Sequence, residues 1–280
     1  MTHYIKLMRP KHYIKNVLIF APIVYAGVLI DASMIFSAVA AFLAFCFVAS
    51  AVYVINDITD CEKDKLHPVN KLRPIASGKI SKRAGAIFST LLACTAFLIV
   101  FFMNNRLVAI FIFAYIVLNS LYTYWLKHMP VLDCFCVAGG FVFRIFAGAA
   151  AVSQEVSQWL FLTVLAGALF MAFGKRRGEM MHMQGNSARK VLQGYSLEFL
   201  NGSVYALAGI SIVFYALWTI TSTDLMVYTV PLVIFIICKY LLNTQKENSY
   251  GDPVSTLLSD GSLIGAVLIF GALSVFLLYI

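Results

Sequence analysis

The chain carries little charge for its length. Only 12% of its 280 residues are Asp, Glu, Lys or Arg, whereas 61% are hydrophobic, and the mean hydropathy is +0.86. Soluble domains carry about twice that share of charged residues. The composition therefore excludes an ordinary soluble protein and predicts one that lies in a membrane.

Acidic residues are scarce and the cysteines show no ligand spacing. The 13 Asp and Glu are outnumbered by 21 Lys and Arg, and none of the six cysteines belongs to a CxxC pair. This spacing argues against a zinc site or a disulfide framework. The net charge of +8 is explained by positive-inside topology and by anionic lipid or substrate phosphates, so no nucleic acid partner is expected.

Nine apolar stretches are each close to the roughly 20 residues that cross a bilayer as a helix. They lie near residues 17–30, 34–56, 84–103, 107–126, 131–153, 157–174, 203–221, 225–243 and 260–280. The runs are continuously apolar, whereas barrel strands would alternate. We predict an all-α, polytopic membrane protein of about nine transmembrane helices, with 1–280 forming a single integral-membrane domain.

Basic residues gather on alternate connections between these stretches. The amino terminus and the loops near 57–83, 175–201 and 244–258 are basic. The opposite connections hold one arginine and three acids, namely Arg106, Asp31, Glu155 and Asp224. The positive-inside rule places the amino terminus and the basic loops in the cytoplasm, with the helices in the cell (inner) membrane.

The most informative motif is N-D-I-T-D-C-E-K-D at residues 56–64. At about 100° per residue on a helix, Asp57, Asp60 and Asp64 point within about 60° of one another. Carboxylates so close repel unless a cation lies between them. Oxygen ligands that do not enclose the ion suit Mg²⁺, which shares its coordination shell with substrate phosphates. The motif predicts a magnesium-diphosphate site with these three ligands; the alternative is a solvated acidic turn.

Charges inside apolar stretches are costly and indicate function. Asp133 and Arg144 return to nearly the same helical face roughly 16 Å apart, and we expect both to face one cavity. Lys127 and Tyr122 would border its cytoplasmic mouth. Alternatively, Lys127 is an interfacial lysine that extends to water, and Arg144 has a structural role.

A second basic cluster is G-K-R-R-G-E at residues 174–179. Glu179 can pair along a helix with Lys175 or Arg176. Arginine binds phosphate through two nitrogens and lysine as a point charge. Three cations at the end of a helix are also a common topology signal, so both interpretations stay open.

Three other segments supply the remaining candidates. Lys15 and Asn16 end the basic segment 9–16, where the choice between phosphate binding and topology is the same. Arg73 lies in the turn-rich segment 68–81, whose cations and prolines suit a loop that closes over an anion. Tyr195 is a further candidate for substrate binding.

The N-D-x-x-D-x-x-x-D motif, followed by N-K-L-R-P-I-A-S-G-K-I-S, resembles the UbiA superfamily of intramembrane prenyltransferases. The segments R-P-K-H-Y-I-K-N, V-L-D-C-F-C-V-A-G-G-F-V-F-R-I-F-A-G-A and F-G-K-R-R-G-E are similar to its branch that includes decaprenyl-phosphate phosphoribosyltransferase. The resemblance implies a helical bundle around a central cavity open to the cytoplasm and to lipid.

The same resemblance implies phosphoribosyl diphosphate as donor, a polyprenyl phosphate as acceptor, and Mg²⁺ as cofactor. Asp57 and Asp60 would grip the diphosphate through the metal, with Asn56 orienting it. The candidates for the 5-phosphate and the acceptor phosphate are Lys15, Lys127, Arg144, Lys175 and Arg176.

Two departures from the family's pattern bear on the reaction. Aromatic-substrate members carry a second aspartate-rich motif after the sixth helix, whereas residues 175–201 contain only Glu179 and Glu198 as acids. An acid expected near Gly194 is also missing. The alternatives to phosphoribosyl transfer are a prenyl diphosphate-dependent transferase acting on an aromatic or isoprenoid acceptor, and a non-enzymatic transporter or lipid-phosphate carrier. The sequence leaves homo-oligomerisation open.

Overall fold

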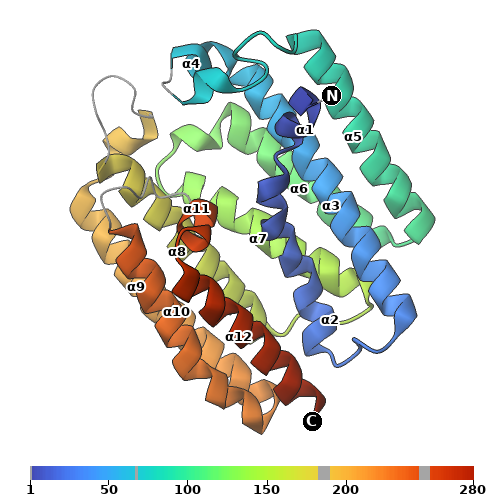
Figure 1. Ribbon diagram of the computed structural model, residues 1–280, viewed down its shortest axis with the longest axis vertical. Helices are drawn as coiled ribbons and strands as arrows, with labels where there is room; N and C mark the ends of the chain where they lie inside the picture. Colours follow the sequence, from blue (N-terminus) through green and yellow to red (C-terminus); the bar gives the residue numbers. More distant parts are fainter. Residues whose placement is uncertain (1, 67–68, 182–189, 246–252) are drawn as a thin grey trace. The chain divides into compact units, whose positions relative to one another are not determined.

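The computed structural model describes residues 2–66, 69–181, 190–245 and 253–280 (Figure 1). Parts of the three predicted loops, at 67–68, 182–189 and 246–252, lie outside the described residues. Every regular element within the described ranges is a helix, and none is a β-strand. The all-α prediction is therefore confirmed.

Eight helices in the described ranges are long and apolar enough to cross a membrane. They are α3 (Ala32–Thr59), α5 (Lys82–Met103), α6 (Arg106–Tyr124), α7 (Leu132–Ala151), α8 (Gln158–Met181), α9 (Leu197–Ser222), the segment Leu225–Thr244, which includes α10 (Val230–Thr244), and α12 (Gly261–Tyr279). They correspond to the predicted stretches from 34–56 onward. The chain is a multi-pass membrane protein.

Shorter elements connect these helices. They are α1 (Thr2–Met8), α2 (Ala21–Tyr25), α4 (Cys61–Leu66) and α11 (Pro253–Leu258), with the 3₁₀ segments η1 (Pro10–Phe20), η2 (Asn70–Leu72), η3 (Leu126–His128), η5 (Lys190–Gly194) and η6 (Asp224–Thr229).

Polar side chains cap the first turn of several of the membrane-spanning helices. Asp31, Asn105 and Asp260 each accept hydrogen bonds from backbone N–H groups of the first turn that follows, which would otherwise lack a partner.

The first predicted stretch, 17–30, differs from one continuous helix. It comprises the end of η1 and then α2, which ends at Tyr25. Pro22 has no N–H, so the hydrogen-bond ladder is interrupted where η1 gives way to α2. Gly27, at φ +72°, then turns the chain.

The chain divides into two compact units. Unit 1 contains residues 1–23, 28–127 and 143–155, and unit 2 contains 24–27, 128–142 and 156–280. The boundary passes through α7, whose first part belongs to unit 2 and whose second part belongs to unit 1. The assignment of 1–280 as a single domain stays a prediction.

The core of unit 1 forms where α3 packs against η1, α5 and α6 (Figure 1). Phe45 and Ile112 are completely buried there. Gly148 of α7 approaches the backbone of Ile19 so closely that a Cβ atom would collide with the Ile19 carbonyl oxygen. Glycine at position 148 thus permits the close packing of α7 against η1.

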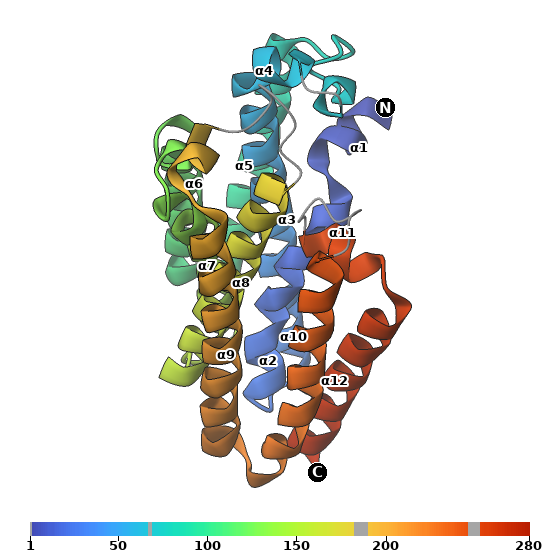
Figure 2. The same ribbon diagram turned by 90° about the vertical axis from the view of Figure 1, so that its left-hand side faces the viewer.

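Unit 2 is organised around the pairing of α8 with α9, with α10 and α12 alongside (Figure 2). Phe173, Leu200 and Leu263 are buried in its core. A second cluster, which includes Trp218 and Tyr215, lies where α9 meets η6. These contacts position the polar residues at the ends of α7 and α8.

Candidate functional site

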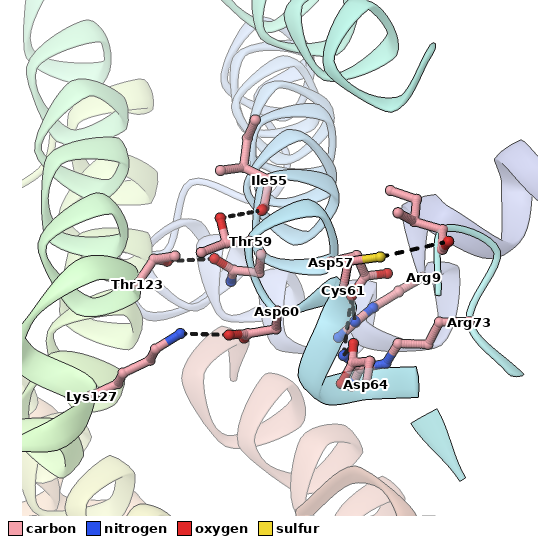
Figure 3. A network of polar contacts seen from close by, with 12 residues as sticks. Arg9, Ile55, Asp57, Thr59, Asp60, Cys61, Asp64, Arg73, Thr123 and Lys127 are labelled. Carbon is pink, nitrogen blue, oxygen red and sulfur yellow. Dashed lines mark hydrogen bonds and ion pairs between the residues drawn. The ribbon is translucent and has the colours of Figure 1, made fainter. Parts of the chain in front are cut away.

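The predicted acidic motif lies where α3 gives way to α4, in unit 1 (Figure 3). Asp57 is in the last turn of α3, Asp60 caps that helix, and Asp64 belongs to α4. The side chains of Asp57 and Asp64 are only 2% and 7% exposed. Asp57 and Asp64 are therefore buried, which argues against a solvated acidic turn, whereas Asp60 is 31% exposed.

Arg73 joins the two buried carboxylates. Its Nη1 atom is 3.2 Å from Asp57 Oδ1 and 2.6 Å from Asp64 Oδ2. Arg9, from the segment before η1, donates a second hydrogen bond to the same Asp57 oxygen. Carboxylates this close repel unless a cation lies between them, and in this structure the cations are guanidinium groups.

Asp60 points toward another partner. Its Oδ1 atom lies 2.8 Å from Lys127 Nζ of η3, whereas Asp57 and Asp64 meet Arg73 (Figure 3). Asn56 accepts a hydrogen bond from Thr123 at the end of α6. The expectation that all three aspartates share one helical face is corrected, because α3 ends at Thr59 and the chain turns at Asp60 before α4 begins.

Glu62 of the same motif belongs to a separate, exposed group. Its carboxylate lies 2.9 Å from both Lys65 Nζ and Lys82 Nζ. These hydrogen bonds, that of Lys65 first, lower the pKa of Glu62 to about 2. Glu62 is thus ionised and paired at neutral pH, apart from the buried aspartates.

Arg144 and Asn16, predicted from different segments, meet in unit 1. Arg144 is 4% exposed, and its Nε atom donates to Asn16 Oδ1 at 2.7 Å. Its Nη2 atom lies 3.3 Å from Tyr115 Oη, and the guanidinium faces the rings of Tyr115 and Phe45 at 4.9 and 5.9 Å. Sequence reasoning missed Tyr115, because a tyrosine within an apolar helix carries no local signal of such a contact.

A second polar network lies in unit 2. Asp133 is fully buried and accepts hydrogen bonds from Arg176 Nε and from Tyr195 Oη, the latter at 2.6 Å. Arg176 Nη1 also donates to Glu179 Oε2 at 2.7 Å, which confirms the expected pairing of Glu179 with a cation of its cluster. The cluster 175–179 lies within α8, which continues to Met181, instead of following a helix that ends near 174.

Asp133 and Arg144 thus have different partners, each within its own unit. That they face one cavity stays a prediction. Lys15, Tyr122 and Lys175 are half-buried, and their roles likewise stay predictions. The sequence also did not single out Arg9 or Thr123, whose partners Asp57 and Asn56 are distant along the chain.

Tyr195 closes a turn just before α7. Its Oη atom accepts a hydrogen bond from the backbone N–H of Val131, which adopts a left-handed φ of +70°. Burial and the bond to Asp133 raise the pKa of Tyr195, so its phenol stays protonated and donates to Asp133. Gly194 lies against Pro130, where a Cβ atom would collide with the ring. A side chain at position 194 would therefore not fit beside Pro130.

The donor set at the α3–α4 junction has the chemistry that Mg²⁺ requires. It offers carboxylate oxygens on buried side chains beside a cluster of cations that can bind phosphate. Within the described residues, no three His, Cys, Asp or Glu side chains are grouped closely enough to hold a metal ion. The residue types fit the ion, and their present partners are cationic side chains.

Comparisons with known proteins agree on one family. The model described as "UbiA prenyltransferase family" matches residues 19–255. A decaprenyl-phosphate phosphoribosyltransferase of Corynebacterium glutamicum is 38% identical over 76% of this chain and 66% of its own length. The Mycolicibacterium smegmatis protein of the same name is 36% identical over 79% of this chain and 72% of its own.

The fold also has a solved counterpart. A UbiA homolog from Archaeoglobus fulgidus bound to GPP and Mg²⁺ superposes with a TM-score of 0.77 over 99% of each chain. The two sequences are 20% identical. The likeness therefore concerns the fold alone.

Proposed function

Because the chain belongs to the UbiA prenyltransferase family of membrane transferases, we propose that it transfers 5-phosphoribose from phosphoribosyl diphosphate to a polyprenyl phosphate and releases diphosphate. The observation that carries this proposal is the similarity of most of the chain to transferases named for decaprenyl phosphate. The acids at 175–201, Glu179 and Glu198, form no second aspartate-rich motif of the kind that would grip a prenyl diphosphate with more metal ions.

In this proposal Asp57, Asp60 and Asp64 hold Mg²⁺, and Asn56 orients the diphosphate. Mg²⁺ held by these carboxylates would supply positive charge beside the leaving diphosphate. Arg73 and Lys127, which now pair with the same aspartates, bind diphosphate oxygens. All of these residues belong to unit 1.

The acceptor needs no strong general base, because a lipid phosphate is already an anionic nucleophile at neutral pH. One of its oxygens attacks the anomeric carbon as the ribosyl group gains oxocarbenium character, by analogy with glycosyl transfer in other enzymes. The bond to diphosphate breaks, and the leaving group takes the electron pair. The polyprenyl tail lies in a groove lined by Phe and Leu and open to the bilayer.

Arg144 is the first candidate to bind one of the remaining phosphates. Its guanidinium is buried, and Asn16 and Tyr115 orient it. Arg176, in contrast, bonds two carboxylates, which suits a role in positioning Asp133 and Glu179. Lys15, Lys175, Tyr122 and Tyr195 complete the proposed substrate-binding set.

We place the protein in the inner membrane, with its amino terminus and the basic loops in the cytoplasm, on the basis of the positive-inside charge pattern. The whole chain acts as one transferase domain in this proposal. Phosphoribosyl diphosphate is water-soluble, so a cytoplasmic site gives it direct access.

A second candidate function is prenyl transfer from a prenyl diphosphate to an aromatic or isoprenoid acceptor. The homolog from Archaeoglobus fulgidus that shares the fold is bound to GPP and Mg²⁺, which favours this alternative. It requires the same diphosphate grip but a different group attached to the diphosphate.

Ligand-dependent melting of the purified protein separates the two candidates. A ligand that binds only the folded state raises the melting temperature in proportion to the logarithm of its concentration over its Kd. We expect phosphoribosyl diphosphate with Mg²⁺ to stabilise the protein by at least about 2 kcal/mol at 100 times its Kd, and geranyl diphosphate with Mg²⁺ to do so much less. If geranyl diphosphate with Mg²⁺ stabilises the protein and phosphoribosyl diphosphate with Mg²⁺ does not, the result supports the prenyl donor instead.

A further inference from the structure

The three aspartates of the motif are matched by three cations. Asp57 bonds Arg9 and Arg73, Asp64 bonds Arg73, and Asp60 bonds Lys127. The pairs that Arg9 and Arg73 form are more buried on the acidic side than on the basic side, whereas in the Asp60–Lys127 pair the lysine is the more buried partner. The carboxylates of Asp57 and Asp64 are almost inaccessible, whereas Arg9 and Arg73 are 23% and 31% exposed.

A metal ion and these guanidinium groups compete for the same oxygens. Asp57 Oδ1 accepts from both arginines, and a carboxylate oxygen offers about two lone pairs. A magnesium ion binds its oxygens at about 2.0–2.1 Å. It would therefore either displace a guanidinium from Asp57 Oδ1 or occupy the other oxygen beside two positive groups that repel it.

We propose that Arg9 and Arg73 exchange partners when the substrate binds, leaving the carboxylates to Mg²⁺ and turning to the diphosphate oxygens. The inference rests on the proposed function, because it takes the metal and the diphosphate as ligands of this site. It adds Arg9 as a diphosphate-binding residue and assigns both arginines a second role, as counter-ions that occupy the site before the ligand arrives.

The backbone around both arginines suits an exchange made by side chains alone. Arg73 has an extended backbone and is followed by Pro74, which disfavours helical geometry at Arg73. Arg9 adopts the left-handed conformation, with φ 54° and ψ 59°, directly before Pro10. Its guanidinium rests on the ring of Tyr53, 5.1 Å from the ring centroid. Both side chains are also partly exposed, so each can turn outward about its own torsions while the backbone stays in place.

The exchange predicts that Mg²⁺ and diphosphate bind as a coupled pair. Mg²⁺ alone must release guanidinium groups that then lack an anion. Diphosphate alone draws the arginines away and leaves two buried carboxylates facing each other. Bound together, each ligand provides the partner that the other removes, so each should raise the affinity of the other by the same factor, about 10-fold or more within the usual range of such coupling.

The test is to titrate the purified full-length protein with Mg²⁺, with inorganic diphosphate and with both, following binding by calorimetry and by melting temperature. In Arg73→Gln we expect Mg²⁺ alone to bind about threefold or more tightly than in the wild type, diphosphate alone to bind more weakly, and the coupling to fall. Magnesium diphosphate also forms in solution, but equally for every variant, so the comparison between variants isolates the contribution of the protein.

Lys65→Gln is the matched control. It removes the same charge from the same part of the chain, but Lys65 pairs with Glu62 and not with the buried aspartates. Its Mg²⁺ affinity and coupling should match the wild type. Arg9→Gln, which removes a guanidinium from Asp57 only, should change both affinities in the same directions as Arg73→Gln and serves as the test if Arg73→Gln does not fold.

The exchange is overturned if the arginine variants bind Mg²⁺ with unchanged or reduced affinity while losing diphosphate binding, because the arginines would then be simple phosphate ligands. Its failure is distinct from failure of the proposed function. Both candidate donors contain diphosphate, so a prenyl donor would refute phosphoribosyl transfer and leave the exchange intact. Phosphoribosyl transfer with no coupling would refute the exchange alone.

Discussion

At the scale of single residues, close packing in unit 1 depends on the absence of a side chain at Gly148. Gly148 of α7 lies so close to the Ile19 carbonyl of η1 that a Cβ atom has no room. The obstacle is backbone, which cannot rotate away as the end of a flexible side chain could. Asn16, which bonds Arg144, belongs to the same 3₁₀ segment, so this contact also fixes the surroundings of the buried arginine.

We predict that Gly148→Ala destabilises the protein by about 1–3 kcal/mol, the usual cost of overpacking. Gly167→Ala is the control, since Gly167 lies within α8 and a Cβ atom there meets nothing within 4 Å. That change should leave stability unchanged or raise it by up to about 1 kcal/mol, because alanine is the better helix former. Melting temperatures in detergent measure both, and equal effects of the two substitutions would refute the packing argument.

The sequence singled out three aspartates of unit 1 as candidate ligands, but it did not predict which side chains they contact. The spacing of Asp57, Asp60 and Asp64 is local and readable from helical geometry. Arg9 and Arg73 lie 48 and 16 positions away from Asp57, and no local pattern joins them to it. Arg144 and Asn16 were both candidates, yet their contact across 128 positions required the structure.

At the scale of elements, the turn between η3 and α7 is held by the end of η5 and by Tyr195, the residue that follows it. Val131 is β-branched and has a left-handed φ of +70°, a conformation that costs of order 1–3 kcal/mol and persists only when its surroundings impose it. The phenol of Tyr195 accepts the Val131 N–H and donates to Asp133. Pro130 packs against Gly194 on the same side. The turn leads directly into α7, so its conformation sets how the chain enters that helix.

We predict that Tyr195→Phe destabilises the protein by about 1–3 kcal/mol, because it leaves the Val131 N–H and an oxygen of Asp133 without this partner. The loss should be smaller by at least about 0.5 kcal/mol when Val131 is glycine, since glycine keeps the left-handed turn without strain. Tyr205→Phe, at an exposed tyrosine of α9, should change stability by less than about 0.5 kcal/mol. Equal losses from Tyr195→Phe in both backgrounds would show that the phenol does not hold the turn.

The ends of elements were harder to predict than their existence. The apolar stretch suggested that a helix ends near 174, whereas α8 continues through the basic cluster to Met181. Hydropathy alone treats Arg176 and Arg177 as residues of a loop. In the folded chain Arg176 bonds the carboxylates of Asp133 and Glu179, and Arg177 donates to the amide oxygen of Asn201. Both guanidinium groups therefore have hydrogen-bond partners, and the helix can continue.

At the scale of the whole molecule, the composition predicted the class of protein, whereas the division into two compact units depends on long-range contacts. Eight spans of the described chain follow from continuous apolar runs, which any window of about 20 residues detects. The boundary between the two units passes within α7. No feature of composition changes there, because that helix is apolar on both sides of the boundary.

The central claim is that this membrane protein moves a phosphorylated pentose onto a lipid phosphate. The measurement that tests it most directly is the fate of phosphoribosyl diphosphate labelled in its 5-phosphate, incubated with the purified protein, polyprenyl phosphate and Mg²⁺. We predict that label enters the lipid fraction as unlabelled diphosphate is released, and that Asp57→Asn lowers the rate by at least about 100-fold, given the several kcal/mol that a bound metal supplies. Label that stays in the aqueous phase, while a labelled prenyl diphosphate places its chain on an aromatic acceptor, would contradict the account.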